Sequence, residues 1–275
     1  MDKHTRTRFA ALAALPDDEI SLDEAALLIA AETEDNIETA IYLEALDLLA
    51  DKFERNFDAR SGLGISANSL IDFIHNEEGF SGNIKDYYDP GNSYLHRVID
   101  TRYGIPITLA LVHIALGSRL GISVCGINFP GHFLVRYGSE RHVIVDPFSG
   151  RILSKPDCSN LLRQIAGPKA ILQDDYFEKA SNKDVLIRIL DNLKQIFWRK
   201  KLWDESKACI DRQLMLLPNR AEFSIQLGAV HEMQGHITLA RLTYLGVLQD
   251  TENENLRGMA GKRLLALESK PAIFH

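Results

Sequence analysis

The sequence predicts an α+β protein in which one buried helix and a small antiparallel sheet form the core, with helical regions before and after it. Three observations predict this fold. Nearly every residue from Ile105 to Leu120 is apolar, as in a helix enclosed by other elements. Short runs rich in Val, Ile and Phe follow it, and these predict strands. From Asp184 onward, apolar residues recur with a period of 34 residues, which is typical of stacked helix pairs.

The central helix has a defined beginning and end. Pro106 suits the first helical turn, where its missing N–H would have no partner inside the helix. Gly121 suits the end, because glycine adopts the left-handed conformation without steric cost.

The strands are expected at Ile122–Phe129, His132–Tyr137 and His142–Asp146, with a turn at Gly138–Arg141. Neighbouring antiparallel strands can place His132 beside Asp146. The carboxylate would then orient the imidazole and leave its other nitrogen free to act as a base. The alternative is a His–Asp pair that only stabilises the core. The spacing alone does not distinguish this structural role from a catalytic one.

Several blocks of this region resemble a known family. The residues GIPITLALVHIALGSRLGISVCGINFPGHFLVR and VIVDPF resemble the transglutaminase-like (papain-like) core. The blocks Asn92–Leu109 and Asn128–Leu134 resemble its bacterial SirB-type branch, which carries a helical-repeat tail. In active members a Cys opens the central helix, and a His and an Asp follow on the strands. The resemblance matches His132 to the His and Asp146 to the Asp.

The resemblance also implies that the usual nucleophile is missing. The Cys position falls near Pro106–Thr108, where the chain has Pro, Ile and Thr. Thr108 is a weak replacement, because a hydroxyl inside a helix usually bonds a carbonyl one turn back. Cys125 lies in the strand before His132, where a Cys is usually a small buried apolar residue. A third route is activation of water by His132 without a covalent step.

The remaining site residues concern binding and metals. Asn92, Pro106 and Gly131 are candidate cleft-lining residues. We expect no metal and no cofactor. His113 or His142 could supply a third ligand beside His132 and Asp146, but His113 lies far along the helix and His142 would need a regular strand. The three cysteines, an odd and widely spaced set, form no disulfide framework or metal motif and fit a reducing cytoplasm; they are Cys125, Cys158 and Cys209.

The chain before the core is expected to be helical and to pack on it. Ser21–Glu24 has capping-box spacing ahead of one helix, and Asp35 or Asn36 is expected to cap the next. A further helix is expected from Leu63 to Phe80, and Asn92-Ser93 is expected to cap a short one. The domain boundaries that we expect are 1–60 for these N-terminal helices, 61–178 for the core and 184–270 for the repeats.

The C-terminal repeats resemble tetratricopeptide repeats. Four positions of the first repeat fall, 34 residues later, on large, small and aromatic residues; the pairs are Leu193 with Leu227, Phe197 with His231, Ser206 with Ala240, and Ile210 with Tyr244. A capping helix is expected near Asn255–Glu268. Such a tail either grips a peptide or protein in a groove or braces the core.

Composition restricts the function. The 275 residues carry a formal net charge of −7, which argues against general nucleic-acid binding. No apolar run approaches the roughly 18 residues of a membrane span, and no signal peptide is evident.

The sequence favours a non-catalytic or degenerate transglutaminase-like protein, a cytoplasmic bacterial pseudoenzyme that binds a protein or peptide through its repeats. The resemblance adds a regulatory role. The first alternative is a cysteine- or water-dependent hydrolase or amidase centred on His132 and Asp146, and the second is a purely structural subunit. The oligomeric state is left open.

Overall fold

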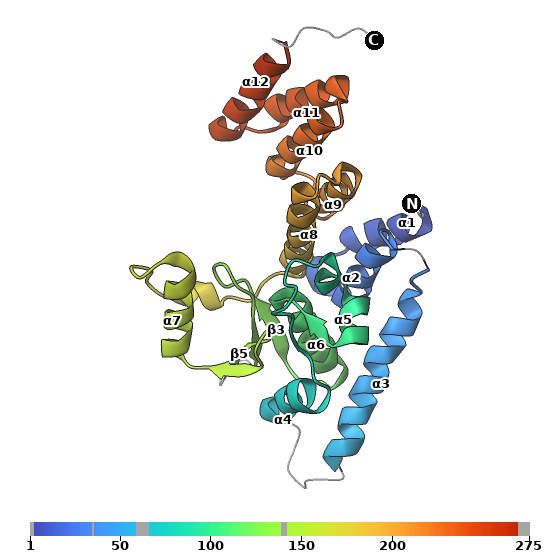
Figure 1. Ribbon diagram of the computed structural model, residues 1–275, viewed down its shortest axis with the longest axis vertical. Coiled ribbons are helices and arrows are strands. Elements are labelled where there is room, and N and C mark those ends of the chain that lie inside the picture. The colour runs from blue at the N-terminus through green and yellow to red at the C-terminus, as the bar shows by residue number, and fades with distance from the viewer. Residues whose placement is uncertain (1–2, 35, 59–65, 139–141, 269–275) are drawn as a thin grey trace. The chain divides into compact units, whose positions relative to one another are not determined.

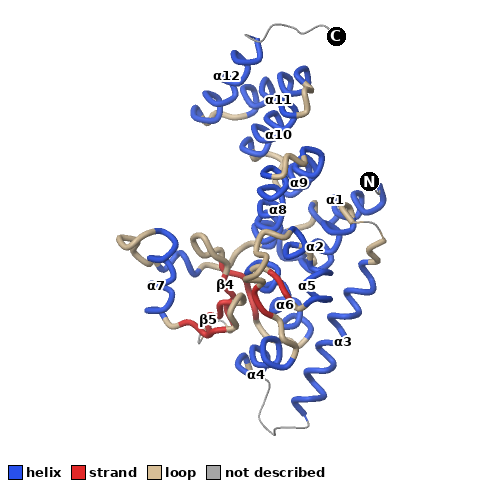
Figure 2. Tube along the Cα trace, viewed as in Figure 1, coloured by secondary structure: helices blue, strands red, loops and turns tan. Residues whose placement is uncertain are grey.

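The computed structural model describes residues 3–34, 36–58, 66–138 and 142–268 (Figure 1). The chain divides into two compact units, one ending at Ile189 and the other beginning at Leu190. This boundary falls within helix α8 (Asn182–Arg199). The described residues form twelve α-helices, a two-stranded parallel sheet and a four-stranded antiparallel sheet (Figure 2). No described helix is both long and apolar enough to cross a bilayer.

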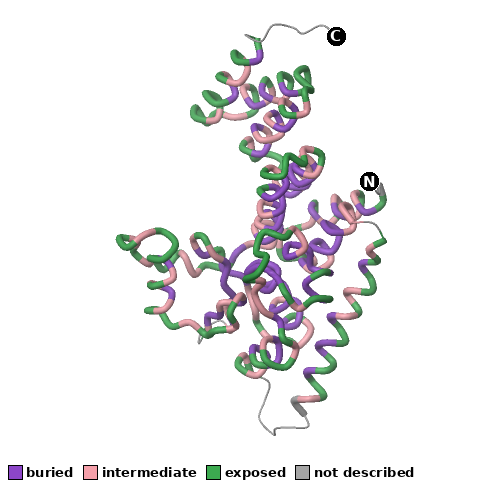
Figure 3. Tube along the Cα trace, viewed as in Figure 1, coloured by how far each residue is buried: buried purple, intermediate pink, exposed green. Residues whose placement is uncertain are grey.

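Helix α6 (Pro106–Arg119) is the centre of the first unit. Pro106 is its first residue and Ile105 its N-cap. Eleven of its fourteen residues are buried, as its almost unbroken apolar sequence predicts (Figure 3). Gly117 permits a close approach to the sheet, because a Cβ there would lie 2.3 Å from the Val124 side chain. The expected helix is therefore present and occupies the core.

The four-stranded sheet has the order β3-β4-β5-β6. Its strands are β3 (Val124–Ile127), β4 (Leu134–Tyr137), β5 (Val143–Asp146) and β6 (Arg151–Leu153). The first three correspond to the expected strands, although β4 begins two residues after His132. A fourth strand that we did not expect, β6, follows the turn after β5, and Arg151 on it pairs with Asp146. The expected turn over Ser139–Arg141 lies outside the described residues.

Three N-terminal helices precede the core, and two of them pack on α6. They are α1 (Lys3–Ala13), α2 (Leu22–Ala31) and α3 (Thr39–Asp58), and both α2 and α3 contact α6. Arg119 at the end of α6 donates to Asp23 at 2.7 Å and to Asp47 at 2.6 Å, which ties α2 and α3 to the core.

The expected caps of these helices are only partly correct. Ser21 is the N-cap residue of α2, but its hydroxyl donates to the Asp23 carboxylate and makes no capping bond to the backbone. Helix α3 begins at Thr39, so neither expected cap lies next to it. Asn36 instead has φ +65°, in the left-handed region, and Asp35 lies outside the described residues.

Two short helices precede the core. Helix α4 (Ala67–Asp72) continues into a π-helical turn at Phe73–Glu77. The expected helix Leu63–Phe80 is therefore shorter and changes its winding, and its first residues lie outside the described part. Helix α5 (Leu95–Thr101) follows a 3-10 turn at Pro90–Ser93. The predicted Asn92-Ser93 cap is wrong, because Tyr94 is the N-cap of α5 and both Asn92 and Ser93 are buried in the turn.

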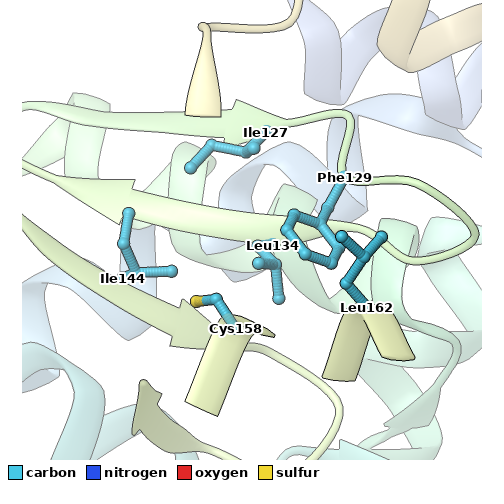
Figure 4. Close-up of a cluster of buried hydrophobic side chains, with 6 residues drawn as sticks. All are labelled: Ile127, Phe129, Leu134, Ile144, Cys158 and Leu162. Carbon is cyan, nitrogen blue, oxygen red and sulfur yellow. The ribbon is translucent and has the colours of Figure 1, made fainter. Parts of the chain in front are cut away.

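Helix α7 (Lys155–Ala166) packs on the face of the sheet formed by alternate residues of β3, β4 and β5. Its N-cap Ser154 forms a capping box with Asp157. The apolar cluster between them is shown in Figure 4 and consists of Ile127, Phe129, Leu134, Ile144, Cys158 and Leu162. A short parallel sheet, β1 (Ser81–Gly82) with β2 (Tyr103–Gly104), connects the turn after the π-helix with the start of α6.

The second unit begins within α8, and its described secondary structure consists of helices joined by short loops. It contains α9 (Trp203–Leu216), α10 (Ala221–Met233), α11 (Ile237–Asp250) and α12 (Glu254–Glu268). Gly228 on α10 accommodates the ring of Tyr244 on α11, since a Cβ at Gly228 would lie 2.5 Å from that ring. Ala240 and Tyr244 are buried in the same cluster. A small residue and an aromatic residue of the sequence period, Gly228 and Tyr244, thus pack against each other in the α10–α11 pair.

Candidate functional site

The candidate site contains a His–Asp pair at one end of the sheet. His132 lies in the loop between β3 and β4, and Asp146 is the last residue of β5. The ladder pairs Val135 with Val145, so Asp146 is next to the His132 end of β4. Nε2 of His132 lies 2.9 Å from Oδ1 of Asp146. The strand register thus produces the contact that the sequence spacing suggests.

Asp146 is held by three hydrogen bonds. Besides His132, the backbone N–H of Phe148 donates to Oδ1 at 3.0 Å and the Ser149 hydroxyl donates to Oδ2 at 2.7 Å. Burial by itself raises the pKa of Asp146, but the bonds from His132, Ser149 and Phe148 outweigh it and lower the pKa below its usual value. The carboxylate is therefore ionised at neutral pH and orients the imidazole through Nε2.

The turn that carries Asp146 is packed from two sides. Gly82 on β1 donates its N–H to the Phe148 carbonyl at 2.9 Å, and a Cβ at Gly82 would lie 2.4 Å from the Phe148 ring. On the other side, Gly150 has φ +71°, and a Cβ there would lie 2.6 Å from the ring of His75. Both glycines allow close packing that fixes the turn, and with it Asp146.

A hydrogen-bonded chain of three residues, two of them fully buried and the third half-buried, lies behind this turn. Nδ1 of His75 lies 2.7 Å from the Phe80 carbonyl, which can only accept, so Nδ1 carries the proton. Nε2 of the neutral His75 then accepts from Nε2 of His113 at 3.0 Å, and Nδ1 of His113 accepts from the Tyr137 hydroxyl. No sequence pattern predicts this chain, because its members come from the π-helix, α6 and β4.

Burial keeps this chain neutral. It lowers the pKa of His75, and it lowers the pKa of His113 well below its usual value. It also raises the pKa of Tyr137. Protonation of His75 would place two N–H donors against each other at the 3.0 Å contact, and protonation of His113 would place an N–H on Nδ1, the atom that accepts from the Tyr137 hydroxyl. The chain is thus a structural support whose integrity depends on pH.

The start of α6 carries no free nucleophile. The hydroxyl of Thr108 is completely buried, donates to the Asn92 carbonyl at 2.6 Å and accepts from the Ile105 N–H at 3.2 Å. It also lies 3.1 Å from the Ile105 carbonyl, one turn back. Its hydrogen-bonding capacity is therefore used to start the helix and to attach the Pro90–Ser93 turn.

Cys125 is placed away from the His–Asp pair. It lies on β3 opposite Arg136, which follows His132 by four residues, or roughly 13 Å of extended chain. It also lines a cavity of about 500 Å³ together with Ala115 and Ser118 near the end of α6, whereas Pro106 is at the beginning. Within the described residues, no hydrogen bond joins Nδ1 of His132 to a thiol or hydroxyl.

The expected cleft-lining residues have structural contacts. The Asn92 amide accepts from Asn83 at 3.0 Å and donates to the Asp86 carbonyl at 2.6 Å, and it borders a hollow of about 130 Å³. Gly131 has φ +68°, and a Cβ there would lie 2.3 Å from Ile165. Pro106 is buried. Gly131 directly precedes His132 in the chain, whereas no hydrogen bond in the described part of the structure joins Asn92 to the His–Asp pair.

Metal binding has no ligand set in the described ranges, which hold no cluster of three His, Cys, Asp or Glu side chains. Both ring nitrogens of His113 are engaged, by His75 and by Tyr137. His142 is exposed and lines a different cavity, which is described below.

The fold and the His–Asp pair define a class of protein, and comparison with known proteins agrees. The family model of the transglutaminase-like superfamily matches residues 40–191, more than half of the 275 residues. The chain therefore belongs to the transglutaminase-like superfamily.

Its relatives narrow this to the UPF0162 proteins. A UPF0162 protein of Xylella fastidiosa (strain 9a5c) is 32% identical over 255 residues, which cover 89% of this chain and 90% of the relative. A UPF0162 protein of Pseudomonas aeruginosa is 38% identical over 189 residues, 69% of each chain. Human F-box only protein 21 is 29% identical over 163 residues, which are 54% of this chain and 25% of that protein. No solved structure matches the chain.

Proposed function

We propose that this protein is a non-catalytic transglutaminase-like protein that binds a protein or peptide partner through its C-terminal helices and serves a regulatory role. The start of α6 is the observation that supports the non-catalytic part of this proposal. Active relatives of this fold open the helix with a Cys, whereas this chain has Pro106 there and a Thr108 hydroxyl engaged by backbone groups. Covalent thiol chemistry at His132 has no nucleophile in this arrangement.

Exposed apolar side chains on the C-terminal helices support the proposed binding of a protein or peptide partner. Leu239, Leu242 and Leu245 recur every three residues along α11, and Leu242 is 60% exposed. Met259 and Leu265 are exposed on α12, the latter by 68%. Large apolar residues that remain exposed in a row are typical of a surface that binds another chain.

The arrangement of helices supports the same proposal. A hollow of about 440 Å³ lies between α10 and α11 and includes Ser224, Leu242 and Gly246. The 34-residue sequence period and the contact between Gly228 and Tyr244 resemble tetratricopeptide packing, a fold that grips peptides in a groove. The occupant that we propose is an apolar peptide segment of a partner protein.

The test combines partner capture with a measured affinity. The full-length protein is used to enrich a partner from a bacterial extract, and binding of the purified partner is then measured by calorimetry. The double substitution Leu239→Glu with Leu242→Glu should weaken binding at least tenfold, because it places two charges in the apolar row. The control Gln195→Glu adds a charge at an exposed position of α8 and should leave the affinity unchanged. The proposal is wrong if the double variant binds as tightly as the wild type.

The alternative function is hydrolysis by water that His132 activates. The observation that favours it is the ionised Asp146 bound to Nε2, which leaves Nδ1 of His132 available as a base. Turnover of a panel of acyl esters and amides separates the two functions. A hydrolase requires activity that His132→Ala abolishes, whereas the non-catalytic proposal expects the wild type and His132→Ala to show the same background rate.

A further inference from the structure

A cavity of about 730 Å³ lies on the sheet face that α7 covers, separate from the His–Asp pair. Strands β4, β5 and β6, the first turn of α7 and the segment Asp174–Glu178 line it. This volume is within the range of about 300–1,000 Å³ that is typical of small-molecule sites. The cavity lies within the first unit of the chain.

Most of the cavity wall is apolar. The ladder pairs Arg136 with Ile144 and Ile144 with Leu153, so these three side chains lie in one row on one face of the sheet. Phe177 adds a ring to the wall, and Ile152 lies at the cavity with half of its surface exposed. This wall is suited to the hydrocarbon part of a ligand.

Arg136 is the charged group within this apolar row. One guanidinium nitrogen, Nη1, donates to the Phe177 carbonyl at 3.1 Å. Nε is buried and has no hydrogen-bond acceptor among the described residues. No described carboxylate lies within the 4.0 Å of an ion pair with this guanidinium. A buried N–H of a charged group without an acceptor is costly, and a carboxylate is the group that a guanidinium binds best.

The other charges of the cavity belong to its rim. Lys155 and Asp174 are both strongly exposed and pair with each other at 2.8 Å. Glu178 is exposed as well. These two rim carboxylates disfavour a dianion such as a phosphate monoester, whereas a single inner guanidinium matches one carboxylate.

We propose that this cavity binds a small organic carboxylate, with its aliphatic or aromatic body against Ile144, Leu153 and Phe177 and its carboxylate on Arg136. The site uses no residue of the His132–Asp146 pair, so the proposal stands independently of the function proposed above. The ligand class that we propose for this cavity is a monoanionic acid of moderate size.

The test uses octanoate and 4-phenylbutyrate as probes, with their primary amides as neutral controls. Calorimetry on the full-length wild-type protein should detect binding of at least one acid with a Kd below 1 mM, and its amide should bind at least tenfold more weakly. Arg136→Met keeps the length of the side chain and removes its charge, and it should weaken binding of the acid at least tenfold. The control Lys85→Met removes an exposed positive charge outside the cavity and should change the Kd less than threefold.

A second variant keeps the proposal testable if Arg136→Met does not fold. Ile152→Glu alters a half-exposed rim residue and leaves Arg136 in place. It should weaken binding of the acid at least tenfold by charge repulsion. Inorganic phosphate should not compete with the acid at equal concentration. The proposal is overturned if neither acid binds the wild type, if the amides bind as tightly as the acids, if phosphate displaces the acid, or if both Arg136→Met and Ile152→Glu bind like the wild type.

Discussion

His75 and His113 face each other through their Nε2 atoms at 3.0 Å, and this contact joins the π-helical turn to the central helix directly behind the turn that carries Asp146. One proton lies between the two nitrogens. The Tyr137 hydroxyl completes the chain at the other side of His113.

This contact predicts a loss of stability in mild acid. The folded protein holds both imidazoles neutral, with their pKa values lowered by burial, whereas in the unfolded chain they titrate near pH 6.5. As the pH falls below 6.5 the unfolded state therefore binds more protons, and the free energy of unfolding decreases by up to about 1.4 kcal/mol per pH unit for each group. Urea unfolding between pH 7.5 and 5.5 measures this slope.

A pair of histidine variants tests whether His75 and His113 cause this pH dependence of the free energy of unfolding. His75→Gln removes one of the two coupled groups and should make the slope shallower. His142→Gln removes an exposed histidine and should leave it as in the wild type. Equal slopes in all three proteins would show that the buried chain is not the cause.

Gly150 and Gly121 form a matched test of the contact between His75 and the Asp146 turn. Both have a left-handed backbone, with φ +71° and +65°. An alanine in that region costs about 1–2 kcal/mol at either position. A Cβ at Gly150 would also lie 2.6 Å from the His75 ring, whereas nothing lies within 4 Å at Gly121. We therefore expect Gly150→Ala to cost about 1–3 kcal/mol more than Gly121→Ala in urea unfolding, and equal costs would contradict the close packing.

Pro106→Cys tests whether the start of α6 still faces His132. A thiol at a helix N-terminus beside a histidine has a lowered pKa and reacts faster at neutral pH. In a Cys125→Ser background, we expect the introduced thiol to be alkylated by iodoacetamide with a midpoint below the roughly 8.5 of a free thiol. Adding His132→Ala should raise that midpoint. A midpoint that does not depend on His132 would mean that the imidazole does not reach the helix start, and the degenerate-site interpretation would fail.

Gly228 and Gly246 test the repeat packing of the second unit. A Cβ at Gly228 would lie 2.5 Å from the Tyr244 ring, whereas at Gly246 the nearest atom is 3.8 Å away. Gly228→Ala should destabilise the protein by about 1–3 kcal/mol through overpacking. Gly246→Ala should stabilise by about 0.5–1 kcal/mol, because alanine is the better helix former. Thermal unfolding of the two variants measures the difference, and a neutral Gly228→Ala would argue against this packing.

Local sequence patterns predict much of the fold and part of the candidate site. The apolar run that became α6, the strand-like segments that became β3 to β5 and the helix near Asn255–Glu268 are visible in the sequence. The contact between His132 and Asp146 followed from the spacing of two neighbouring strands. The cap predicted at Asn92-Ser93 failed because Asn92 bonds within its own loop, a competition between side chain and backbone that spacing does not reveal.

The sequence by itself determined the buried helix, three strands of the antiparallel sheet and the absence of a Cys from Pro106–Thr108, because periodicity and residue identity are properties of short segments. Only the tertiary structure decided that His75 supports the Asp146 turn, that the Thr108 hydroxyl bonds backbone groups, and that Nε of Arg136, beside an apolar cavity, has no acceptor among the described residues. Those contacts join residues that are distant in the chain, such as His75 and His113, 38 positions apart. Whether such side chains meet depends on how packed elements exclude water and satisfy each other's polar groups, and no local pattern records that outcome.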